Sequence, residues 1–313
     1  MNQKQSINYP LQFALLIGLM GLFIIITSFL VAFIGNLVMH VPYLQVPDRL
    51  NRPENVNISR VLNTLASVLV FMLPALVLAK ILGKQPFHQL GFTIKMSSKQ
   101  LLLVVMITFS SMVLSGALGE LNEKIPLPAK WLAQAKSLEE SYKTAMMSMA
   151  TMKSTADYLI SLLVLAFAPA LVEEILFRGG FQQIFIGWTN NKWAGIILTS
   201  ILFSAIHFSY FGFLPRAVLG IILGLLFYYS KNIWLNILLH FLNNAFVVTQ
   251  LYIVSRQGKS IDKTMDESMP IWWGLIAFAF LYLFMSQFKK ESLQLAGVIE
   301  QNTIDSYPEK TTD

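Results

Sequence analysis

Long apolar runs recur along the 313-residue chain, each near the length that crosses a bilayer. A helix needs roughly 20 predominantly apolar residues to span the hydrocarbon core. Backbone polar groups in lipid must be satisfied within the protein, so such runs predict helices. We expect eight spans, the fifth and sixth being the shortest, at about residues 11–39, 60–83, 100–118, 157–185, 193–209, 213–230, 232–254 and 271–288.

Two segments interrupt this pattern. Residues 119–156 mix charged and apolar side chains, and Leu132, Ala135 and Tyr142 recur at helical spacing. This spacing predicts an amphipathic helix on the membrane surface, which is either a plain connection or a gate over a site. Residues 289–313 are polar and show no periodicity, which predicts a flexible tail.

Composition agrees with an all-α, multi-pass integral membrane protein. Hydrophobic residues make up 55% of the chain and charged residues 13%, whereas soluble domains carry about 25% charged residues. The net charge of +6 is spread along the loops and predicts contact with lipid rather than with nucleic acid. Basic residues divide almost evenly between the two sides, so they do not indicate an orientation. The chain has no cysteine, which excludes a thiol nucleophile and thiolate metal ligands.

Ionisable side chains inside the predicted spans are few, and each is a candidate for function. A charge at the bilayer centre costs roughly 2.5–3.5 kcal/mol on insertion scales. In the fourth span Glu174 and Arg178 are four residues apart with the acid first, which favours a helical ion pair. Glu173 points about 100° away around the helix and has no partner in its own turn. Glu173 is therefore the carboxylate available to activate water or to hold a cation.

Two other spans bring polar groups to the same depth. His207 lies late in the fifth span, while His240 and Asn244 are four residues apart and share one face of the seventh. A lone histidine at this depth is more often a residue that hydrogen-bonds between helices, and Asn244 alone could have the same role. Together with Glu173 they predict a buried cluster that activates water or holds a metal.

In their order along the chain these motifs resemble the CAAX prenyl endopeptidase and bacteriocin-processing family, also called CPBP or Abi. The matching motifs are Glu173-Glu174-x-x-x-Arg178, Phe203-x-x-x-His207 and His240-x-x-x-Asn244. The resemblance implies a catalytic core at about 151–255. It would follow the N-terminal spans and amphipathic segment of 1–150 and precede the last span and tail of 256–313.

The resemblance also implies an activity, an endopeptidase that cuts within or near the bilayer. Its partners would be membrane lipid and a peptide or protein substrate, lipidated in some members of the family. Glu173 would activate the attacking water, and Glu174 and Arg178 would support it.

The remaining motif residues have implied roles around the scissile bond. His207 and His240 would position the water or bind a metal, and Asn244 would polarise the scissile carbonyl or stabilise the oxyanion. Glu173 with the two histidines would suit zinc with one open position, and the motif leaves the use of a metal open.

Other classes of protein remain as alternatives. A non-catalytic membrane protein, such as an immunity protein that captures a toxic peptide, would keep the fold without needing Glu173. A transporter usually shows internal repeats and paired broken helices, and the sequence has neither. A serine peptidase of the rhomboid kind would need a Gly-x-Ser-x-Gly-like nucleophile, and the sequence lacks one.

Overall fold

The computed structural model describes residues 7–149, 152, 154–257 and 270–305, and these form helices joined by turns and short loops. Within this part of the chain, seven helices are long and apolar enough to cross a membrane. They are Tyr9–Met39, Val56–Leu82, Ser98–Glu123, Thr155–Thr189, Phe213–Ser230, Ile233–Arg256 and Ile271–Gly297. The all-α, multi-pass prediction is confirmed.

The predicted fifth span is shorter than expected. Helix α11 covers Lys192–Ala205, which is only 14 residues, so the boundary of 193–209 was wrong. A helix of this length rises about 21 Å, less than the ~30 Å hydrocarbon core. The residues after Ala205 form turns rather than helix, and they include His207.

Several spans are built from successive helical segments. The long helices without such a division, besides α11, are α1 (Tyr9–Met39), α6 (Ser98–Glu123), α7 (Ala129–Met149), α12 (Phe213–Ser230), α13 (Ile233–Arg256) and α15 (Ile271–Asp305). The second span consists of α3 (Val56–Ser67), η3 (Val68–Met72) and α4 (Leu73–Leu82). The fourth consists of α8 (Thr155–Ser161), η4 (Leu162–Phe167), α9 (Ala168–Glu174), η5 (Ile175–Gln182) and α10 (Gln183–Thr189). Short elements are η1 (Tyr43–Gln45), α2 (Val46–Leu50), η2 (Pro53–Asn55) and α5 (Pro86–Gln89).

The segments η3, η4 and η5 are π-helical, and proline explains the first two. Pro74 and Pro169 each follow such a segment by two residues. A proline inside a helix lacks a donor and clashes with the carbonyl four residues before it. A wider π turn relieves this clash, and such turns are frequent at functional sites. Pro169 lies one turn before Glu173, so the break falls next to the predicted site.

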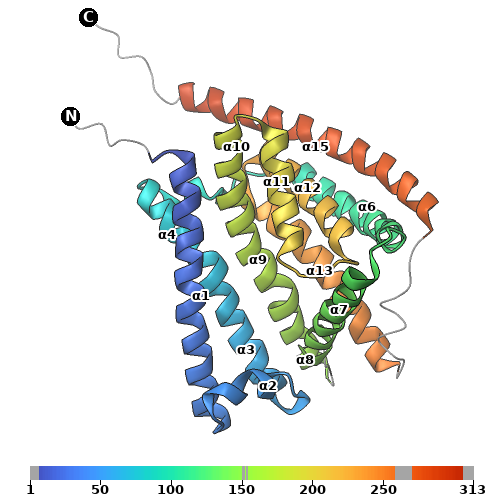
Figure 1. Ribbon diagram of the computed structural model, residues 1–313. Helices are drawn as coiled ribbons and strands as arrows, with labels where there is room; N and C mark the ends of the chain where they lie inside the picture. The colour runs from blue at the N-terminus through green and yellow to red at the C-terminus, as the bar shows by residue number, and fades with distance from the viewer. Residues whose placement is uncertain (1–6, 150–151, 153, 258–269, 306–313) are drawn as a thin grey trace, which may run out of the picture.

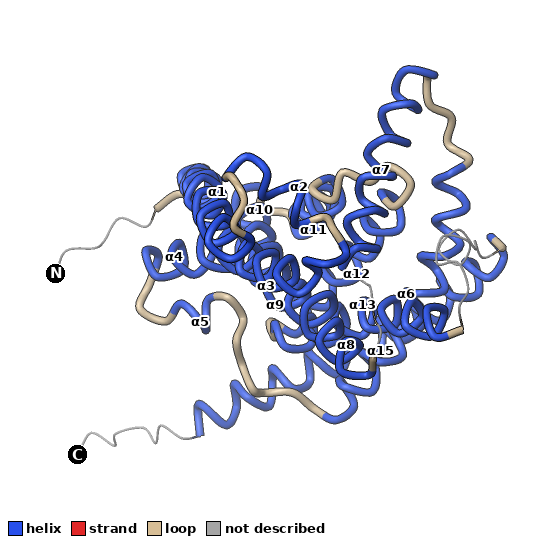
Figure 2. The backbone as a smooth tube through the Cα atoms, turned by 90° about the horizontal axis from the view of Figure 1, so that it is seen from below, coloured by secondary structure: helices blue, strands red, loops and turns tan. Residues whose placement is uncertain are grey.

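The span α8–α10 runs through the middle of the bundle (Figure 1). Helices α1, α3 and α4 lie on one side of it and α12, α13, α6 and α15 on the other, an order that the view from below repeats (Figure 2). One apolar core joins Leu16 of α1 and Leu78 of α4 to Phe177 of η5. A second core joins α6, α12, α13 and α15, with Leu223 and Leu239 completely buried. The central span therefore has protein on both sides.

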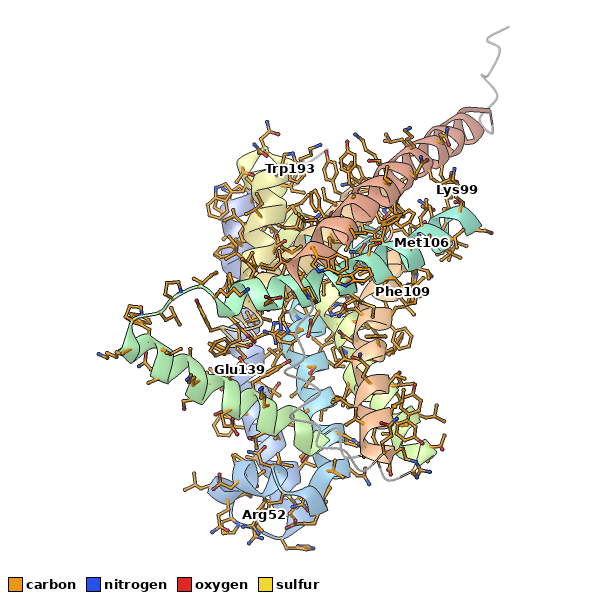
Figure 3. The ribbon with its side chains drawn as sticks, turned by 90° about the vertical axis from the view of Figure 1, so that its right-hand side faces the viewer. Arg52, Lys99, Met106, Phe109, Glu139 and Trp193 are labelled. Carbon is orange, nitrogen blue, oxygen red and sulfur yellow. The ribbon has the colours of Figure 1, made fainter. Side chains whose placement is uncertain are left out.

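The prediction of a flexible tail from residue 289 was wrong, because α15 continues as far as Asp305. Phe288 is completely buried, and Glu291 accepts a hydrogen bond from Ser97 and pairs with Lys99 at 3.1 Å. Lys99 lies beside α15 in Figure 3. These contacts with the start of α6 explain how a polar sequence stays helical. Residues 306–313 lie outside the described residues.

The amphipathic prediction for 119–156 is correct in kind but not in its bounds. Residues 119–123 belong to α6, and the separate helix α7 begins at Ala129. One face of α7 packs on the bundle, with Ala135 buried and Glu139 accepting a 2.7 Å hydrogen bond from Ser209. Figure 3 shows α7 crossing the bundle diagonally, with Glu139 along its length. Helix α7 therefore rests on protein near the loop that carries His207.

Candidate active site

A cavity of about 350 Å³ opens between the central span and its neighbours. Its walls are apolar where Leu165, Leu219 and Val248 line it. Its polar lining residues are Asn63, Thr64, Ser67, Tyr142, Glu173, His207, Arg216, His240, Asn243 and Asn244. Four predicted site residues thus share one cavity: Glu173 from α9, His207 from the turn after α11, and His240 and Asn244 from α13. An apolar pocket with a few convergent polar groups is the usual form of a binding or catalytic site.

The other two predicted residues, Glu174 and Arg178, lie behind the cavity wall. Both side chains are 0% exposed, and the Arg178 Nε atom donates to Glu174 Oε2 at 3.0 Å. The predicted ion pair is confirmed. The guanidinium also lies over the Phe203 ring, with its Cζ atom 5.4 Å from the ring centroid. This pair supports the site and does not touch the cavity.

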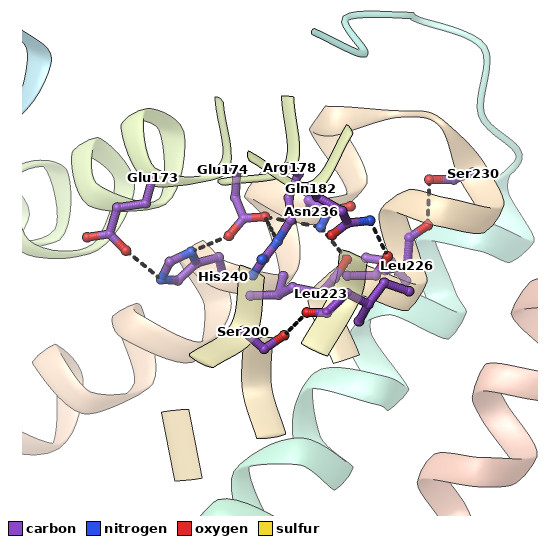
Figure 4. Close-up of polar contacts among 12 residues, drawn as sticks. Glu173, Glu174, Arg178, Gln182, Ser200, Leu223, Leu226, Ser230, Asn236 and His240 are labelled. Atoms are coloured by element: carbon purple, nitrogen blue, oxygen red, sulfur yellow. Dashed lines mark hydrogen bonds and ion pairs between the residues drawn. The ribbon is translucent and has the colours of Figure 1, made fainter. Parts of the chain in front are cut away.

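Glu174 organises the buried polar network of Figure 4. Its Oε2 atom accepts from Asn236 Nδ2 at 3.1 Å as well as from Arg178, and its Oε1 atom contacts His240 Nδ1 at 2.9 Å. A carboxylate is an acceptor, so the His240 Nδ1 atom carries the proton in this contact. Glu174 therefore fixes both the orientation and the tautomer of His240.

His240 lies between the two adjacent glutamates. With Nδ1 committed to Glu174, its Nε2 atom faces Glu173 Oε2 at 3.8 Å. The Glu173 side chain is 13% exposed, and its carboxylate lines the cavity. One water molecule could contact Nε2 and Oε2 at once, since each lies within hydrogen-bonding reach of a common point. The structure thus gives the adjacent glutamates different surroundings.

His207 lies in the turn after α11 and is held by local contacts. Its Nδ1 atom donates to the carbonyl oxygen of Phe203 at 2.8 Å, because a carbonyl can only accept. This leaves Nε2 as an acceptor in a ring that lines the cavity. The Phe203 ring separates the two imidazoles, at centroid distances of 5.2 Å from His207 and 5.8 Å from His240. The hydroxyl of Ser204 donates to the carbonyl of Phe213 and holds the turn against α12.

Asn244 reaches the cavity one turn after His240. The neighbouring Asn243 side chain donates to Asn244 Oδ1 at 3.4 Å. This contact leaves the Asn244 Nδ2 group as a donor at the cavity wall. A preorganised amide donor of this kind suits the stabilisation of a developing negative charge on oxygen.

Two polar residues at the candidate site were not identified from the sequence. Asn236 completes the network around Glu174, and its position four residues before His240 on α13 was a visible signal. Arg216 lines the cavity from the first turn of α12, and its charge next to Pro215 at the start of a span was the corresponding signal. Both are polar groups inside spans, which is the same criterion that selected the other site residues.

The donors do not form a metal site as they stand. Glu173, His207 and His240 line the same cavity, but no group of three or more His, Asp and Glu side chains within the described ranges is arranged to hold a metal ion. The Phe203 ring lies between the two imidazoles and keeps them apart, whereas the hydrogen bond from His240 Nδ1 to Glu174 leaves His240 Nε2 facing the cavity. Zinc binding at this site therefore stays a prediction.

These features define a multi-pass membrane protein with a carboxylate, two imidazoles and a carboxamide around one buried cavity. Residues 155–246 match the family model described as type II CAAX prenyl endopeptidase, Rce1-like. The match covers all three motifs and confirms the predicted resemblance to the CAAX prenyl endopeptidase family. No curated protein and no solved structure gave a match.

Proposed function

We propose that the protein is an intramembrane endopeptidase that hydrolyses a peptide bond of a membrane-associated substrate with water activated by Glu173. The position of Glu173 carries this proposal. Among the described residues that line the cavity it is the one carboxylate, and the adjacent Glu174 is already committed to three donors. The family match supports the class of reaction.

The first step is attack by water on the scissile carbonyl. A water molecule between Glu173 Oε2 and His240 Nε2 gives one proton to the Glu173 carboxylate and donates its second hydrogen to His240 Nε2 as a hydrogen bond. The water oxygen forms a bond to the carbonyl carbon, and the carbonyl electron pair moves onto its oxygen. Positioned general bases contribute typically 10²–10⁴-fold to such a step.

The second step is collapse of the tetrahedral intermediate. The Asn244 Nδ2 group donates to the oxyanion until the carbonyl reforms. The C–N bond then breaks, and the proton held by Glu173 goes to the departing amine. The products are a carboxylic acid and an amine, and Glu173 returns to its starting state.

Replacement of Glu173 with glutamine tests the proposal. The amide keeps the shape of the side chain but cannot take the proton, so we expect cleavage to fall by about 10²-fold or more with normal protein yield. The probe is a quenched-fluorescent, farnesylated peptide ending in Cys-Val-Ile-Met, presented to protein in lipid nanodiscs. A second assay does not depend on this probe. It compares the new peptide termini that appear in membrane fractions of cells expressing the wild type or Glu173→Gln.

Glu123→Gln is the matched control, because Glu123 is exposed at the end of α6 and does not line the cavity. It should cleave like the wild type. Equal cleavage by Glu173→Gln and the wild type would show that the base is wrongly assigned. A folded wild type that cuts neither the probe nor any cellular peptide would instead favour a non-catalytic, peptide-binding role.

A further inference from the structure

The mechanism above leaves one cationic group of the cavity without a role. Arg216 lines the same cavity as Glu173, and its Nη1 atom is buried without a hydrogen-bond partner. No carboxylate of the described residues lies within 4.0 Å of it, whereas the other arginine near the site, Arg178, pairs with Glu174. A buried donor of a charged group without an acceptor is destabilising, so it needs an explanation.

The fold holds this guanidinium at the cavity. Its Cζ atom lies 5.0 Å from the centre of the Tyr142 ring, a cation–π contact that links α12 to α7. Gly212 leaves the space for it, because a Cβ atom there would lie 2.3 Å from Arg216 Nη1. The side chain is therefore held beside Tyr142, and its buried Nη1 donor has no acceptor among the described residues.

The chemistry of the group indicates its ligand. A guanidinium presents planar paired donors that match a carboxylate in a two-point contact. Glu173 could have provided this carboxylate, but it remains separate from Arg216 and free for water. The cavity of about 350 Å³ is at the small end of the range for ligand sites, so a group at Arg216 lies only a short distance from the bond at Glu173.

We propose that Arg216 binds a carboxylate of the substrate and so directs the enzyme to bonds near such a group. The carboxylate is either the free carboxyl terminus of the substrate or an acidic side chain close to the scissile bond. This inference rests on the proposed function and adds the substrate class to the same site. Arg216 acts in binding and selection, while Glu173 performs the chemistry.

The test combines three peptides with four proteins in nanodiscs. The peptides are the farnesylated probe with a free carboxyl terminus, the same probe with a terminal amide, and the amidated probe with Glu in place of its Ile. The proteins are the wild type, Arg216→Gln, Arg216→Lys and the control Arg256→Gln, whose arginine is exposed at the end of α13. KM and kcat are measured for each, and binding is measured separately by fluorescence anisotropy in a Glu173→Gln background.

The expected result is a loss of discrimination in the variant. In the wild type, amidation should raise KM and the dissociation constant by about 10- to 100-fold, the value of a hydrogen bond to a charged group. Arg216→Gln should bind the free-carboxylate probe as weakly as the wild type binds the amide, with kcat little changed. Arg216→Lys should recover part of the discrimination. Recovery of binding by the Glu-containing amide would identify an acidic side chain as the source.

Three outcomes would overturn the inference. The wild type could bind all three peptides equally or none of them, or Arg216→Gln could lower kcat to the same extent for every peptide, which would make Arg216 an oxyanion donor. The binding measurement does not depend on cleavage. A wild type that discriminates in binding but never cleaves would therefore refute the proposed peptidase and keep Arg216 as a carboxylate site.

Discussion

Replacement of Arg178 with methionine removes the guanidinium that pairs with Glu174 and keeps a side chain of similar length. The Glu174 carboxylate would stay 0% exposed, with Asn236 and His240 as its remaining partners. Removing one member of a buried ion pair costs about 3–5 kcal/mol, because the other charge stays buried. Arg178→Met should therefore lower stability and protein yield.

The structure places the magnitude at the lower end of this range. Only the Nε atom of Arg178 makes a hydrogen bond, while its Nη1 and Nη2 atoms are buried without partners. Loss of those two groups removes no hydrogen bond, and two neutral donors still contact Glu174. The contact with the Phe203 ring is also lost, which adds about 0.5–2 kcal/mol. With about 3 kcal/mol from the ion pair and about 1 kcal/mol from the ring contact, we expect a total destabilisation of about 4 kcal/mol.

The double variant Glu174→Gln, Arg178→Met separates charge from shape. Replacing both members of a buried pair with neutral groups of similar volume is often neutral or stabilising. We therefore expect the double variant to be more stable than Arg178→Met alone. Because His240 would lose the carboxylate that fixes its tautomer, cleavage should still fall.

The assay is thermal unfolding of purified protein in one detergent, read as the apparent midpoint, with yield as a second measure. A shared detergent is essential, since unfolding of membrane proteins is seldom reversible and the midpoint then reflects a rate. An Arg178→Met protein with the wild-type midpoint and yield would refute the assignment of a stabilising ion pair. A double variant less stable than the single one would show that the charge on Glu174 is favourable even without Arg178.

Two further predictions concern the reacting atoms. Asn244→Ala removes the proposed oxyanion donor and should lower kcat by about 10²–10³-fold with KM little changed. A loss of substrate binding as large as the loss of kcat would contradict that role. Treatment with a chelator, followed by added zinc, tests the metal directly. Cleavage that survives the chelator would support activation of water by Glu173 without a metal, and a loss that zinc restores would show that Glu173, His207 and His240 rearrange around one.

Local spacing predicted the parts of the site that lie on one helix. The four-residue separation of Glu174 and Arg178 predicted their ion pair, and the same rule applied to His240 would have included Asn236. Arg216 and Tyr142 meet across two helices that are distant in the sequence, so no spacing rule could pair them. Tertiary packing decided that contact.

The errors in the predicted spans have similar causes. The polar run after Phe288 has no apolar period, yet Glu291 and Ser292 bond to residues at the start of α6 and keep α15 helical. The fifth span was extended to residue 209 on hydropathy, but α11 ends at Ala205, where the turn that carries His207 begins. In both places side-chain hydrogen bonds between elements outweighed the average polarity of the segment.

Adjacent residues on one helix explain how this site combines rigidity with reactivity. Glu173 and Glu174 differ by about 100° in direction, so one carboxylate faces the cavity while the other points into the polar network behind it. Glu174 uses both of its oxygens to hold Arg178, Asn236 and His240, and His240 in turn presents a fixed nitrogen to Glu173. A reactive carboxylate needs freedom to exchange a proton, and a positioning carboxylate needs all its acceptors occupied. The two requirements conflict in one residue, and the structure meets them with two.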